Sequence, residues 1–436
     1  MLDNTAMPSL SQIAASIAGY DPNALPVAQA RDFIARLVPR VQAVECLAIR
    51  SALGRVLARE VVSPIDVPAF DNSAMDGYAL RSAELVSDLA AGRDTLISVA
   101  GTGFAGASFS GAAGPGQGVR IMTGAVMPDG LDTVVPQEFT RTDADGRVRI
   151  PAGTVKPGDN RRLRGEDLAH GEPALLAGRL LSPADLGLLA SLGQAEVAVF
   201  RRLRVAFFST GDELRSVGEP LADGNVYDSN RYTIWGMLTR LGIEVIDLGV
   251  VRDNPAALRI AFTQAAACAD AVITSGGVSV GEADHTKQIM AQLGEVLFWK
   301  IAMRPGRPMA IGRIGAPEQP CMLFGLPGNP VAVMVTFYAF VRDALLAMSG
   351  ATVQPLPLLR AVSEQALRKK PGRTEYQRGI VTLGPDGRWQ VRITGAQGSG
   401  ILRSMSQANG MVVLHHEQGD VAAGDRVDVM PFDGLV

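Results

Sequence analysis

The chain has 436 residues, of which 47% are hydrophobic and 19% are charged, and its formal net charge is −3. This length allows about three domains with ordinary hydrophobic cores, and the composition excludes a disordered or collagen-like chain. So small a net charge supplies no overall basic field for nucleic acid or an anionic membrane, so we expect neither as a partner.

The first part of the chain changes from helical to β-like texture and back. Residues 1–26 are small and polar with three prolines, which predicts a loose N-terminal arm with at most one short helix. Apolar residues with helical spacing begin at Val27, and a second short helix is predicted over 52–60. Residues 66–167 are rich in glycine and proline between short apolar runs, which predicts a compact all-β insert. Helical texture returns after Ser182, a good N-cap, so the segments flanking the insert are predicted to form one interrupted domain.

Strand-like and helix-like segments alternate from residue 201 to residue 351. This order predicts a doubly wound, parallel sheet, whose ligands bind beyond the carboxyl ends of the strands. The texture is β again afterwards, with a hairpin signal at Asp386-Gly387. The predicted domains are an arm (1–26), a discontinuous mixed α/β domain (27–65 and 168–200), a β insert (66–167), a doubly wound domain (201–351) and a C-terminal β-domain (352–436).

A glycine-rich segment follows the third strand of the predicted doubly wound domain. Ser275 ends that strand, Gly276 and Gly277 let the backbone approach a ligand, and Asp284 stands where a helix begins. A loop of this kind at a helix start favours a phosphate, although its spacing is neither that of a Walker A loop nor GxGxxG. The alternative is an ordinary glycine-rich turn between a strand and a helix.

Acidic residues follow three strands of the same domain. Glu213 comes after the first strand, Asp253 after the second and Asp284 after the third. Because the carboxyl ends of parallel strands meet at one edge of a sheet, we expect these acids beside Ser275. Hydrated Mg²⁺ prefers one or two carboxylates together with substrate phosphates, so the three acids are predicted metal ligands. The alternative is that each acid only caps a helix.

A basic turn and a helix start come later in this domain. Lys300 and Arg304 share one face of a predicted strand, and Arg307 adds a cation after the turn. Such cations can hold an oxyanion. Pro327 and Pro330 flank a Gly-Asn pair that opens a long apolar helix, whose first N–H groups attract anions. The alternatives are a solvated basic turn and a rigid loop without a ligand.

Three polar motifs lie within the β insert, at 71–78, 121–124 and 161–167. Their concentration in a glycine-rich region predicts a binding edge, without saying for which ligand. The chain contains no nucleophile elbow, no HExxH motif and no Cys/His nucleophile pattern, so hydrolase chemistry has no support.

The numbers of cysteines and histidines bear on the cellular compartment of the protein. Three widely separated cysteines and four histidines exclude a disulfide framework and a Cys/His zinc site. The N-terminus has no basic leader, and we identify no unbroken apolar run of about 18 residues. We therefore expect a cytoplasmic protein.

Seven motifs together resemble one family. They are FDNSAMDGYA, RIMTGA, RRLRGED, STGDEL, SGGVSVGEADHTK, KIAMRPGRP and GLPGNPV. Their order and approximate spacing are similar to those of the bacterial MoeA family of molybdopterin molybdenumtransferases, which is related to the E domain of gephyrin. The resemblance implies a homodimer of four-domain chains, with a MoaB/MogA-like doubly wound domain and a β-barrel-like C-terminal domain. It also implies insertion of molybdenum from molybdate into adenylylated molybdopterin, with release of AMP and a requirement for Mg²⁺.

The resemblance further implies roles for individual residues. The implied catalytic acids are Asp76, Asp167, Glu213, Asp253 and Asp284, the last three of which would serve Mg²⁺ and the pyrophosphate linkage. The implied substrate-binding residues are Thr123, Ser275, Gly276, Gly277, Lys300, Arg304, Pro327, Pro330, Arg378 and Ser399. Within this set, the positions associated with the molybdate pocket are Lys300, Arg304, Pro330, Arg378 and Ser399. In a dimer, the insert residues among these would complete the cleft of the neighbouring subunit.

Some features depart from the family or leave alternatives open. Many relatives carry lysines where this chain has Arg304 and Arg307, and an aromatic residue where it has His285; a guanidinium binds an oxyanion with different reach.

The single doubly wound domain leaves adenylylation of the substrate to another protein, so an adenylyltransferase and molybdoenzyme-maturation proteins are candidate partners. A CinA-like nucleotide or pterin-nucleotide hydrolase, acting without molybdate, and a gephyrin-like scaffold remain as other classes. The sequence does not distinguish molybdate from tungstate.

Overall fold

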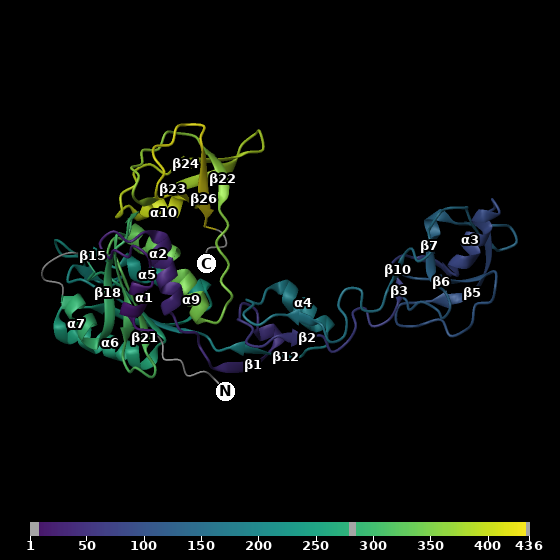
Figure 1. The fold of residues 1–436 in the computed structure, drawn as a ribbon, viewed down its shortest axis with the longest axis horizontal. Helices are drawn as coiled ribbons and strands as arrows, with labels where there is room; N and C mark the ends of the chain where they lie inside the picture. The colour runs from purple at the N-terminus through teal and green to yellow at the C-terminus, as the bar shows by residue number, and fades with distance from the viewer. Residues whose placement is uncertain (1–7, 279–284, 433–436) are drawn as a thin grey trace.

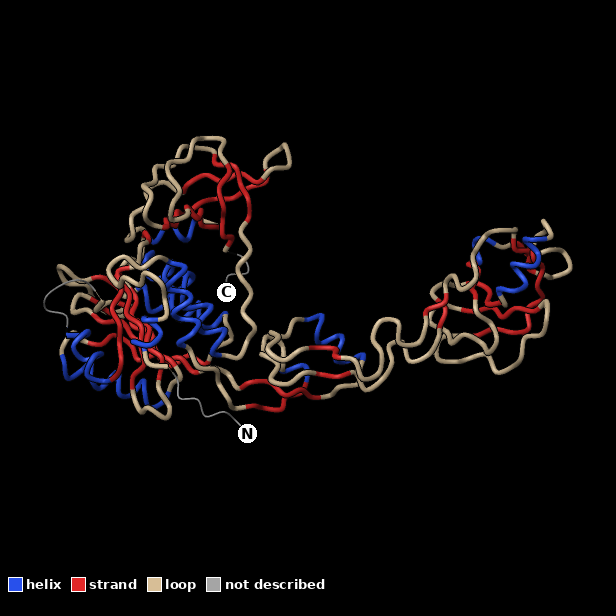
Figure 2. The backbone as a smooth tube through the Cα atoms, in the orientation of Figure 1, coloured by secondary structure: helices blue, strands red, loops and turns tan. Residues whose placement is uncertain are grey.

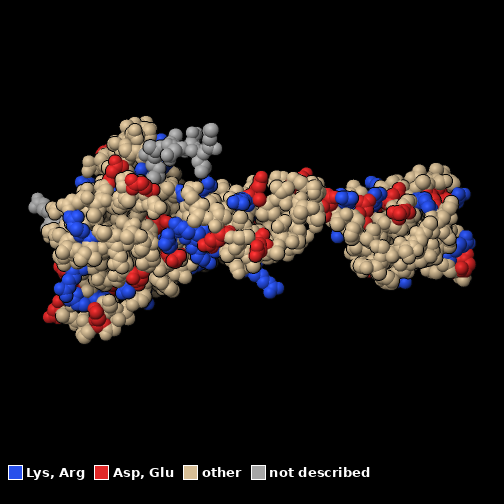
Figure 3. Space-filling model, turned by 90° about the horizontal axis from the view of Figure 1, so that it is seen from below, with Lys and Arg blue, Asp and Glu red and all other residues tan. Residues whose placement is uncertain are grey.

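The computed structural model describes residues 8–278 and 285–432. They form an elongated molecule with the doubly wound domain at one end, the β insert at the other end and a small mixed domain between them (Figure 1). The C-terminal β-domain stands beside the doubly wound domain, and loops connect the mixed domain to the insert (Figure 2). On the face shown in Figure 3, basic and acidic side chains are interspersed, and neither sign covers a whole domain.

A six-stranded sheet forms the centre of the doubly wound domain, with strand order β16-β13-β17-β21-β20-β18. The first four strands in that order are parallel, while β20 and β18 are antiparallel to their neighbours. The bounds are β13 (Arg204–Thr210), β16 (Glu244–Val251), β17 (Ala271–Ser275), β18 (Gly294–Lys300), β20 (Pro308–Ile314) and β21 (Cys321–Leu326). Two short strands, β14 (Leu214–Arg215) and β15 (Val226–Tyr227), pair beside this sheet.

Helices cover both faces of this sheet, as the doubly wound prediction requires. Val205 and Phe207 of β13 belong to one apolar cluster, whereas Ala206 and Phe208 belong to another, so alternate residues face opposite layers. The helices are α5 (Ser229–Arg240), α6 (Pro255–Cys268), α7 (His285–Leu293) and a continuous run of α8 (Pro330–Thr336), the π-helix η3 (Phe337–Val341) and α9 (Arg342–Met348). The run from Pro330 to Met348 is apolar and long enough to cross a membrane, but 72% of its most apolar window is buried inside the protein.

Two N-terminal segments pack in another domain than the one predicted: the arm (1–26) and the start of the mixed domain (27–37). The arm contains α1 (Leu10–Ala15), and the next helix is α2 (Val27–Leu37); both pack into the larger cluster of the doubly wound domain. Phe33 of α2 meets Trp299 edge to face at 5.0 Å between ring centroids, and the Trp299 indole N–H donates to the Tyr20 hydroxyl at 2.8 Å. Residues 8–37 therefore belong to the doubly wound domain, because their apolar faces are buried there.

The mixed domain pairs β1 (Val44–Ala48) with β12 (Glu196–Phe200), and β2 (Val61–Val62) with β11 (Pro173–Leu175). Its helix α4 (Pro183–Ser191) begins after Ser182, as predicted, and the 3₁₀ turn η1 (Ile49–Ser51) precedes Ala52. The helix predicted over 52–60 is absent. Gly54 there has a φ of 69°, and Val56 and Leu57 instead form β-bridges, so a left-handed residue interrupts the expected helix.

The insert is built on a six-stranded sheet of order β7-β4-β6-β5-β9-β8. Its strands are β3 (Asn72–Ser73), β4 (Gly77–Leu80), β5 (Thr95–Gly103), β6 (Gln117–Ile121), β7 (Thr133–Pro136), β8 (Arg141–Thr142), β9 (Val148–Ile150) and β10 (Arg161–Arg162), with a 3₁₀ turn η2 (Gln137–Phe139). One helix, α3 (Ser82–Ala90), was not predicted, and the insert is therefore β-rich rather than purely β. None of its residues is buried, so α3 lies at the surface of the insert.

The C-terminal domain is a closed five-stranded barrel, in which β23 pairs with both β24 and β25. Its elements are β22 (Leu359–Ser363), β23 (Thr374–Leu383), β24 (Trp389–Ile393), α10 (Leu402–Gln407), β25 (Gly410–Leu414) and β26 (Arg426–Pro431). The predicted hairpin at Asp386-Gly387 joins β23 to β24. A short strand of the doubly wound domain, β19 (Met303–Arg304), extends this sheet by pairing with β23.

Candidate functional site

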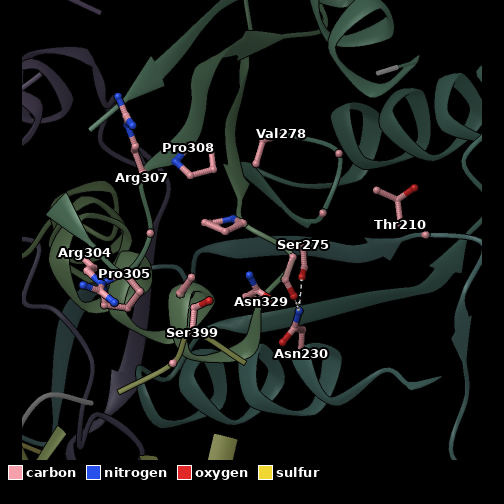
Figure 4. Close-up of a pocket in the computed structure, with 18 of the residues that line it drawn as sticks. Thr210, Asn230, Ser275, Val278, Arg304, Pro305, Arg307, Pro308, Asn329 and Ser399 are labelled. Atoms are coloured by element: carbon pink, nitrogen blue, oxygen red, sulfur yellow. Dashed lines mark hydrogen bonds between the residues drawn. The ribbon is translucent and has the colours of Figure 1, made fainter. Parts of the chain in front are cut away.

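A cavity of about 870 Å³ opens at the carboxyl ends of the parallel strands. We call it the strand-end pocket. Its lining residues are Thr210, Gly211, Glu213, Leu214, Asn230, Asp253, 275–278, 303–308, 327–329, Ala332, Arg373 and 397–399. Figure 4 shows Arg304, Arg307 and Ser399 toward one side of the view, Thr210 toward the other, and Ser275 and Asn230 between them. The predicted strand-end site is therefore a real cavity with polar walls.

Two domains build this cavity. Met303 and Arg304 of β19 pair with Thr374 and Glu375 at the start of β23, so the basic turn is joined directly to the barrel. This pairing brings Arg373 and residues 397–399 of the C-terminal domain to the wall opposite the strand ends. Sequence reasoning alone did not foresee the pairing, because it joins residues about 70 positions apart.

The acidic wall contains Glu213 and Asp253, which line the pocket from the turns after β13 and β16. Asp253 is half-buried, and its Oδ1 is buried without a hydrogen-bond partner among the described residues. Glu213 folds back so closely that a Cβ on Gly211 would lie 2.6 Å from its Oε2. Asp284, the third predicted acid, lies outside the described residues. Two of the three predicted metal ligands therefore meet in one cavity.

The glycine-rich loop lines the pocket through Ser275, Gly276 and Gly277. The two glycines have φ values of 96° and 66°, in the left-handed region. A Cβ would lie 2.5 Å from the Thr210 carbonyl oxygen at Gly276, and 2.4 Å from Thr286 Oγ1 at Gly277. The packing of the protein thus requires glycine at both positions. This requirement is separate from the close approach of a ligand, which was the reason expected from the sequence.

The basic wall contains Arg304 and Arg307, both of them exposed. Neither guanidinium group makes a salt bridge or hydrogen bond within the described part of the chain. Unpaired guanidinium groups in a pocket favour a bound anion. The prediction that Lys300 and Arg304 share one strand is wrong: Lys300 ends β18 of the doubly wound sheet, whereas Arg304 lies in β19, which pairs with the barrel. Lys300 does not line the pocket, and its backbone is hydrogen-bonded to Pro22 and Leu25.

Arg378 lies behind the pocket wall and is fully buried. Its guanidinium donates to the carbonyl oxygens of Gly398 at 2.9 Å and Gln397 at 3.3 Å, and to Ser404 Oγ at 3.0 Å. Burial, and to a smaller degree the positive charge of Arg304, lowers the pKa of Arg378 to about 10. Arg378 therefore holds the loop that presents Ser399, rather than adding a side chain to the lining.

The loop before α8 completes the pocket. Pro327 and Asn329 line it, whereas Pro330 starts the helix just beyond. The Val331 N–H, one of the first-turn groups expected to be free for an anion, donates to the Ser399 carbonyl at 3.0 Å. This bond is a further link between the doubly wound domain and the C-terminal domain. It also leaves the Val331 N–H, which was predicted to bind an anion, unavailable to a ligand.

The three polar motifs of the insert converge on one edge, but outside the pocket. Asp76 Oδ1 accepts hydrogen bonds from the N–H and the hydroxyl of Thr123, each at 2.7 Å. These bonds, the backbone one first, hold the pKa of Asp76 below its ordinary value. Asp167 is exposed, and β10 beside β3 brings its segment next to the motif that carries Asp76. In one chain this edge lies at the far end from the pocket (Figure 1).

The lining residues that were not among the predicted site residues include the polar side chains of Thr210, Asn230, Arg373 and Gln397. Asn230 had a usable signal, because it follows the Asp228 N-cap at the start of α5, next to a strand end. Arg373 and Gln397 had none, since only the β19–β23 pairing places the barrel against the pocket.

The sequence matches three family descriptions in chain order. They are "MoeA N-terminal region (domain I and II)" over 25–193, "Probable molybdopterin binding domain" over 206–347 and "MoeA C-terminal region (domain IV)" over 360–432. A protein of Haemophilus influenzae called molybdopterin molybdenumtransferase is 42% identical over 94% of this chain and 100% of its own. The chain belongs to the molybdopterin molybdenumtransferase (MoeA) family. Its doubly wound domain is the family's molybdopterin-binding domain, and this confirms the expectation from the motifs.

Other relatives agree with this membership. A Nostoc protein of the same name is 39% identical over 93% of this chain and 94% of its own. A crystal structure titled as the molybdopterin biosynthesis MoeA protein from Pyrococcus horikoshii matches with a TM-score of 0.78 and 26% identity, covering 94% of this chain and 100% of that one. The multidomain α/β plus β fold expected from the sequence is confirmed.

Proposed function

We propose that this chain inserts molybdenum from molybdate into adenylylated molybdopterin in the strand-end pocket, releasing AMP and completing the molybdenum cofactor. The observation that carries the proposal is the polarity of the pocket: carboxylates on one wall and unpaired arginines on the other. A substrate with a pyrophosphate linkage and a separate oxyanion needs both kinds of wall. The similarity to proteins named for this activity, over nearly the whole chain, supports the same conclusion.

The acidic wall fits Mg²⁺. Glu213 and Asp253 supply hard oxygen ligands, and the unpartnered, buried Oδ1 of Asp253 is a polar atom that a cation would satisfy. Mg²⁺ commonly takes one or two carboxylates from a protein and its remaining ligands from phosphate and water, which Glu213 and Asp253 fit. When bound, Mg²⁺ would polarise the phosphate oxygens of the pyrophosphate linkage.

The chain's own residues then bind and orient the two substrates. Ser275 and its loop hold the phosphate end beside the acids, and Arg304 and Arg307 hold molybdate near the dithiolene of the pterin. The orientation makes transfer of the metal to sulfur effectively intramolecular. Because the substrate supplies the sulfurs, the three cysteines need no chemical role; Cys321 is buried, and this burial raises its pKa to about 12.

Assembly and location are further parts of the proposal. The separation of the Asp76–Thr123 edge from the pocket supports a homodimer in which each insert completes the partner's cleft. A separate adenylyltransferase would supply the substrate, and a molybdoenzyme-maturation protein would accept the product. We place these steps in the cytoplasm.

Asp253→Asn tests the acidic wall. The change keeps the side chain's shape but removes its charge, so AMP release at saturating substrate should fall at least about tenfold, since even outer-shell metal partners are worth about that much. AMP and active cofactor are followed with adenylylated molybdopterin and Mg²⁺, with and without molybdate. Asp223→Asn, at an exposed position outside the pocket, is the matched control and should retain full activity.

The same assay separates the proposed transferase from a hydrolase. Molybdate-dependent formation of active cofactor supports the proposal. AMP release without molybdate, and without cofactor formation, would instead support nucleotide hydrolysis in this pocket.

A further inference from the structure

Asn230 connects three segments at the floor of the strand-end pocket. It lies in the first turn of α5 and is 8% exposed. Its Nδ2 donates to Ser275 Oγ at the end of β17 at 2.7 Å, and to the Gly328 carbonyl oxygen before α8 at 2.6 Å (Figure 4). One amide nitrogen thereby joins the glycine-rich loop and the loop before α8 to the start of a third element.

The bond to Gly328 fixes which way the amide faces. A carbonyl oxygen only accepts hydrogen bonds, so the nitrogen of Asn230, and not its oxygen, must face Gly328. The same nitrogen faces Ser275, whose hydroxyl oxygen is therefore an acceptor in this contact. The orientation of Asn230 thus decides the direction of the hydrogen bond to Ser275.

This direction leaves the proton of Ser275 available to the pocket. Ser275 is 2% exposed and lines the cavity, and its side chain has no other hydrogen-bond partner within the described ranges. A buried hydroxyl that already accepts a bond can still donate one. An anionic oxygen in the pocket is the acceptor that such a donor favours most strongly.

We propose that Asn230 is a positioning residue that makes Ser275 a hydrogen-bond donor to an anionic phosphate oxygen of the bound substrate. It acts through Ser275 and does not itself contact that oxygen. The proposal rests on the proposed function, because it takes the phosphate linkage of adenylylated molybdopterin as the group bound beside Ser275.

The oxygen of the same amide has no partner of its own in the part of the chain that the structure describes. Asn230 Oδ1 is buried without a partner in the described structure, and it lies on the side of the amide away from Ser275. A side chain used only to cross-link the loops would be expected to satisfy both of its polar atoms within the protein. Its unmet acceptor is therefore one that a water molecule would satisfy.

A double-mutant cycle on substrate affinity tests the proposal. Wild type, Asn230→Ala, Ser275→Ala and the double variant are titrated with adenylylated molybdopterin, and binding is followed directly. Ser275→Ala should weaken binding about ten- to a hundredfold, as expected for one charge-assisted contact. Asn230→Ala should weaken it about fivefold or more in wild type, but less than about twofold when Ser275 is already alanine. Equal effects of Asn230→Ala in both backgrounds would overturn the proposal.

Two further variants separate positioning from simple loss of structure. Asn230→Asp keeps the shape, but its carboxylate can only accept hydrogen bonds, so the Ser275 hydroxyl would donate to it instead of to the substrate. Binding should therefore weaken at least as much as in Asn230→Ala, and near-wild-type affinity would overturn the proposal even if Asn230→Ala fails to fold. Asn409 makes a comparable two-bond clamp in the barrel, to the N–H and carbonyl of Val381 at 2.7 and 2.9 Å. Asn409→Ala should lower Tm without changing substrate affinity.

The outcomes also distinguish this proposal from the proposed function. Coupling between Asn230 and Ser275 without AMP release would support the positioning role and contradict the transferase reaction. AMP release and cofactor formation without coupling between Asn230 and Ser275 would support the transferase reaction and contradict the positioning role. A wild-type chain that does not bind adenylylated molybdopterin would overturn both.

Discussion

Arg378 shows how a charge can serve a site from behind its wall. It is fully buried, makes no salt bridge within the described part of the chain, and gives its donors to the loop that ends at Ser399. Its charge also lies near Arg304, which lines the pocket. Two neighbouring cations without a carboxylate would be stabilised by an anion in the cavity. Arg378 can therefore affect oxyanion binding both through its charge and by positioning the loop.

Arg378→Ala should consequently change stability and binding together. Carbonyl oxygens left unpaired in the interior cost about 1–3 kcal/mol each, so we expect the free energy of unfolding to fall by about 2–3 kcal/mol. The molybdate concentration for half-maximal cofactor formation should rise several-fold, because the loop that carries Ser399 loses its support and the positive charge near Arg304 is removed. Denaturant unfolding and a molybdate titration measure the two effects.

Arg360 provides the matched control in the same domain. It is 74% exposed, and its ion pair with Asp428 is at the surface, where such pairs are worth about 0–1 kcal/mol. Arg360→Ala should leave both measurements nearly unchanged. An Arg378→Ala protein of wild-type stability would show that its hydrogen bonds to the 397–398 carbonyls are not important.

The strand-end residues could be predicted because a local rule places them. Parallel strands put their carboxyl ends at one edge, so Glu213, Asp253 and Ser275 could be located without any long-range contact. The places of Arg378 and Lys300 could not be predicted. Arg378 is buried behind a loop and Lys300 is hydrogen-bonded to the N-terminal arm, and sequence spacing does not reveal such tertiary contacts.

At the scale of elements, α4 forms where its sequence signals stand. Ser182 and Asp185 make a reciprocal capping box, and Pro183 occupies the first turn. Asp185 is almost fully buried and also pairs with Arg179 at 2.9 Å. Burial raises the pKa of Asp185, but the hydrogen bonds from Arg179 and Ser182 outweigh it, so the pKa lies below its ordinary value of 3.8. Strong local signals of this kind make such helices predictable.

Asp185→Asn should therefore lower stability in a pH-dependent way. Because the folded protein holds the pKa of Asp185 below the unfolded value, its contribution is complete above the unfolded pKa and is lost as pH falls through the folded pKa. We expect a loss of about 1–2 kcal/mol at pH 7, typical of a helix cap, which shrinks below about pH 4. Denaturant unfolding at pH 7 and at pH 3 measures the difference.

Asp32 is the control for this measurement. It forms an exposed i,i+4 pair with Arg36 in α2, which is worth only about 0.3–0.5 kcal/mol. If Asp185→Asn destabilises the protein no more than Asp32→Asn at pH 7, the capping box does not anchor α4.

Sequence reasoning failed at two elements, the helix α3 and the segment 52–60. The helix α3 is 9 residues long, buries none of them and stands among β-like runs, so the sequence pattern around it predicts a β insert. The segment 52–60 has helical composition, but Gly54 adopts a left-handed φ, and Val56 and Leu57 satisfy their backbone groups in β-bridges. Tertiary pairing decided the structure there, against the local propensity.

At the scale of the whole molecule, the polar edge of the insert requires an explanation. Asp76, Thr123 and the segment of Asp167 are assembled at one end of an elongated chain, whereas the pocket lies in the domain at the other end (Figure 1). Asp76 and Thr123 are exposed and bonded to each other rather than to a neighbouring domain. A two-fold dimer of the kind proposed would bring such an edge to a pocket, with each copy supplying its insert edge to the other.

Mixing two inactive variants tests this arrangement. Asp76→Ala removes a residue of the insert edge and Asp253→Asn removes a charge from the strand-end pocket, so each homodimer should have two defective sites. If the sites are shared, a heterodimer of the two has one site with both defects and one with neither. Because random mixing makes half of the dimers heterodimers, activity should recover to about a quarter of the wild-type value per chain. Cofactor formation is measured after co-refolding or subunit exchange, with heterodimers confirmed by differently sized tags. Heterodimers that recover no activity would show that each pocket works with the insert of its own chain, which would then have to bend back toward it.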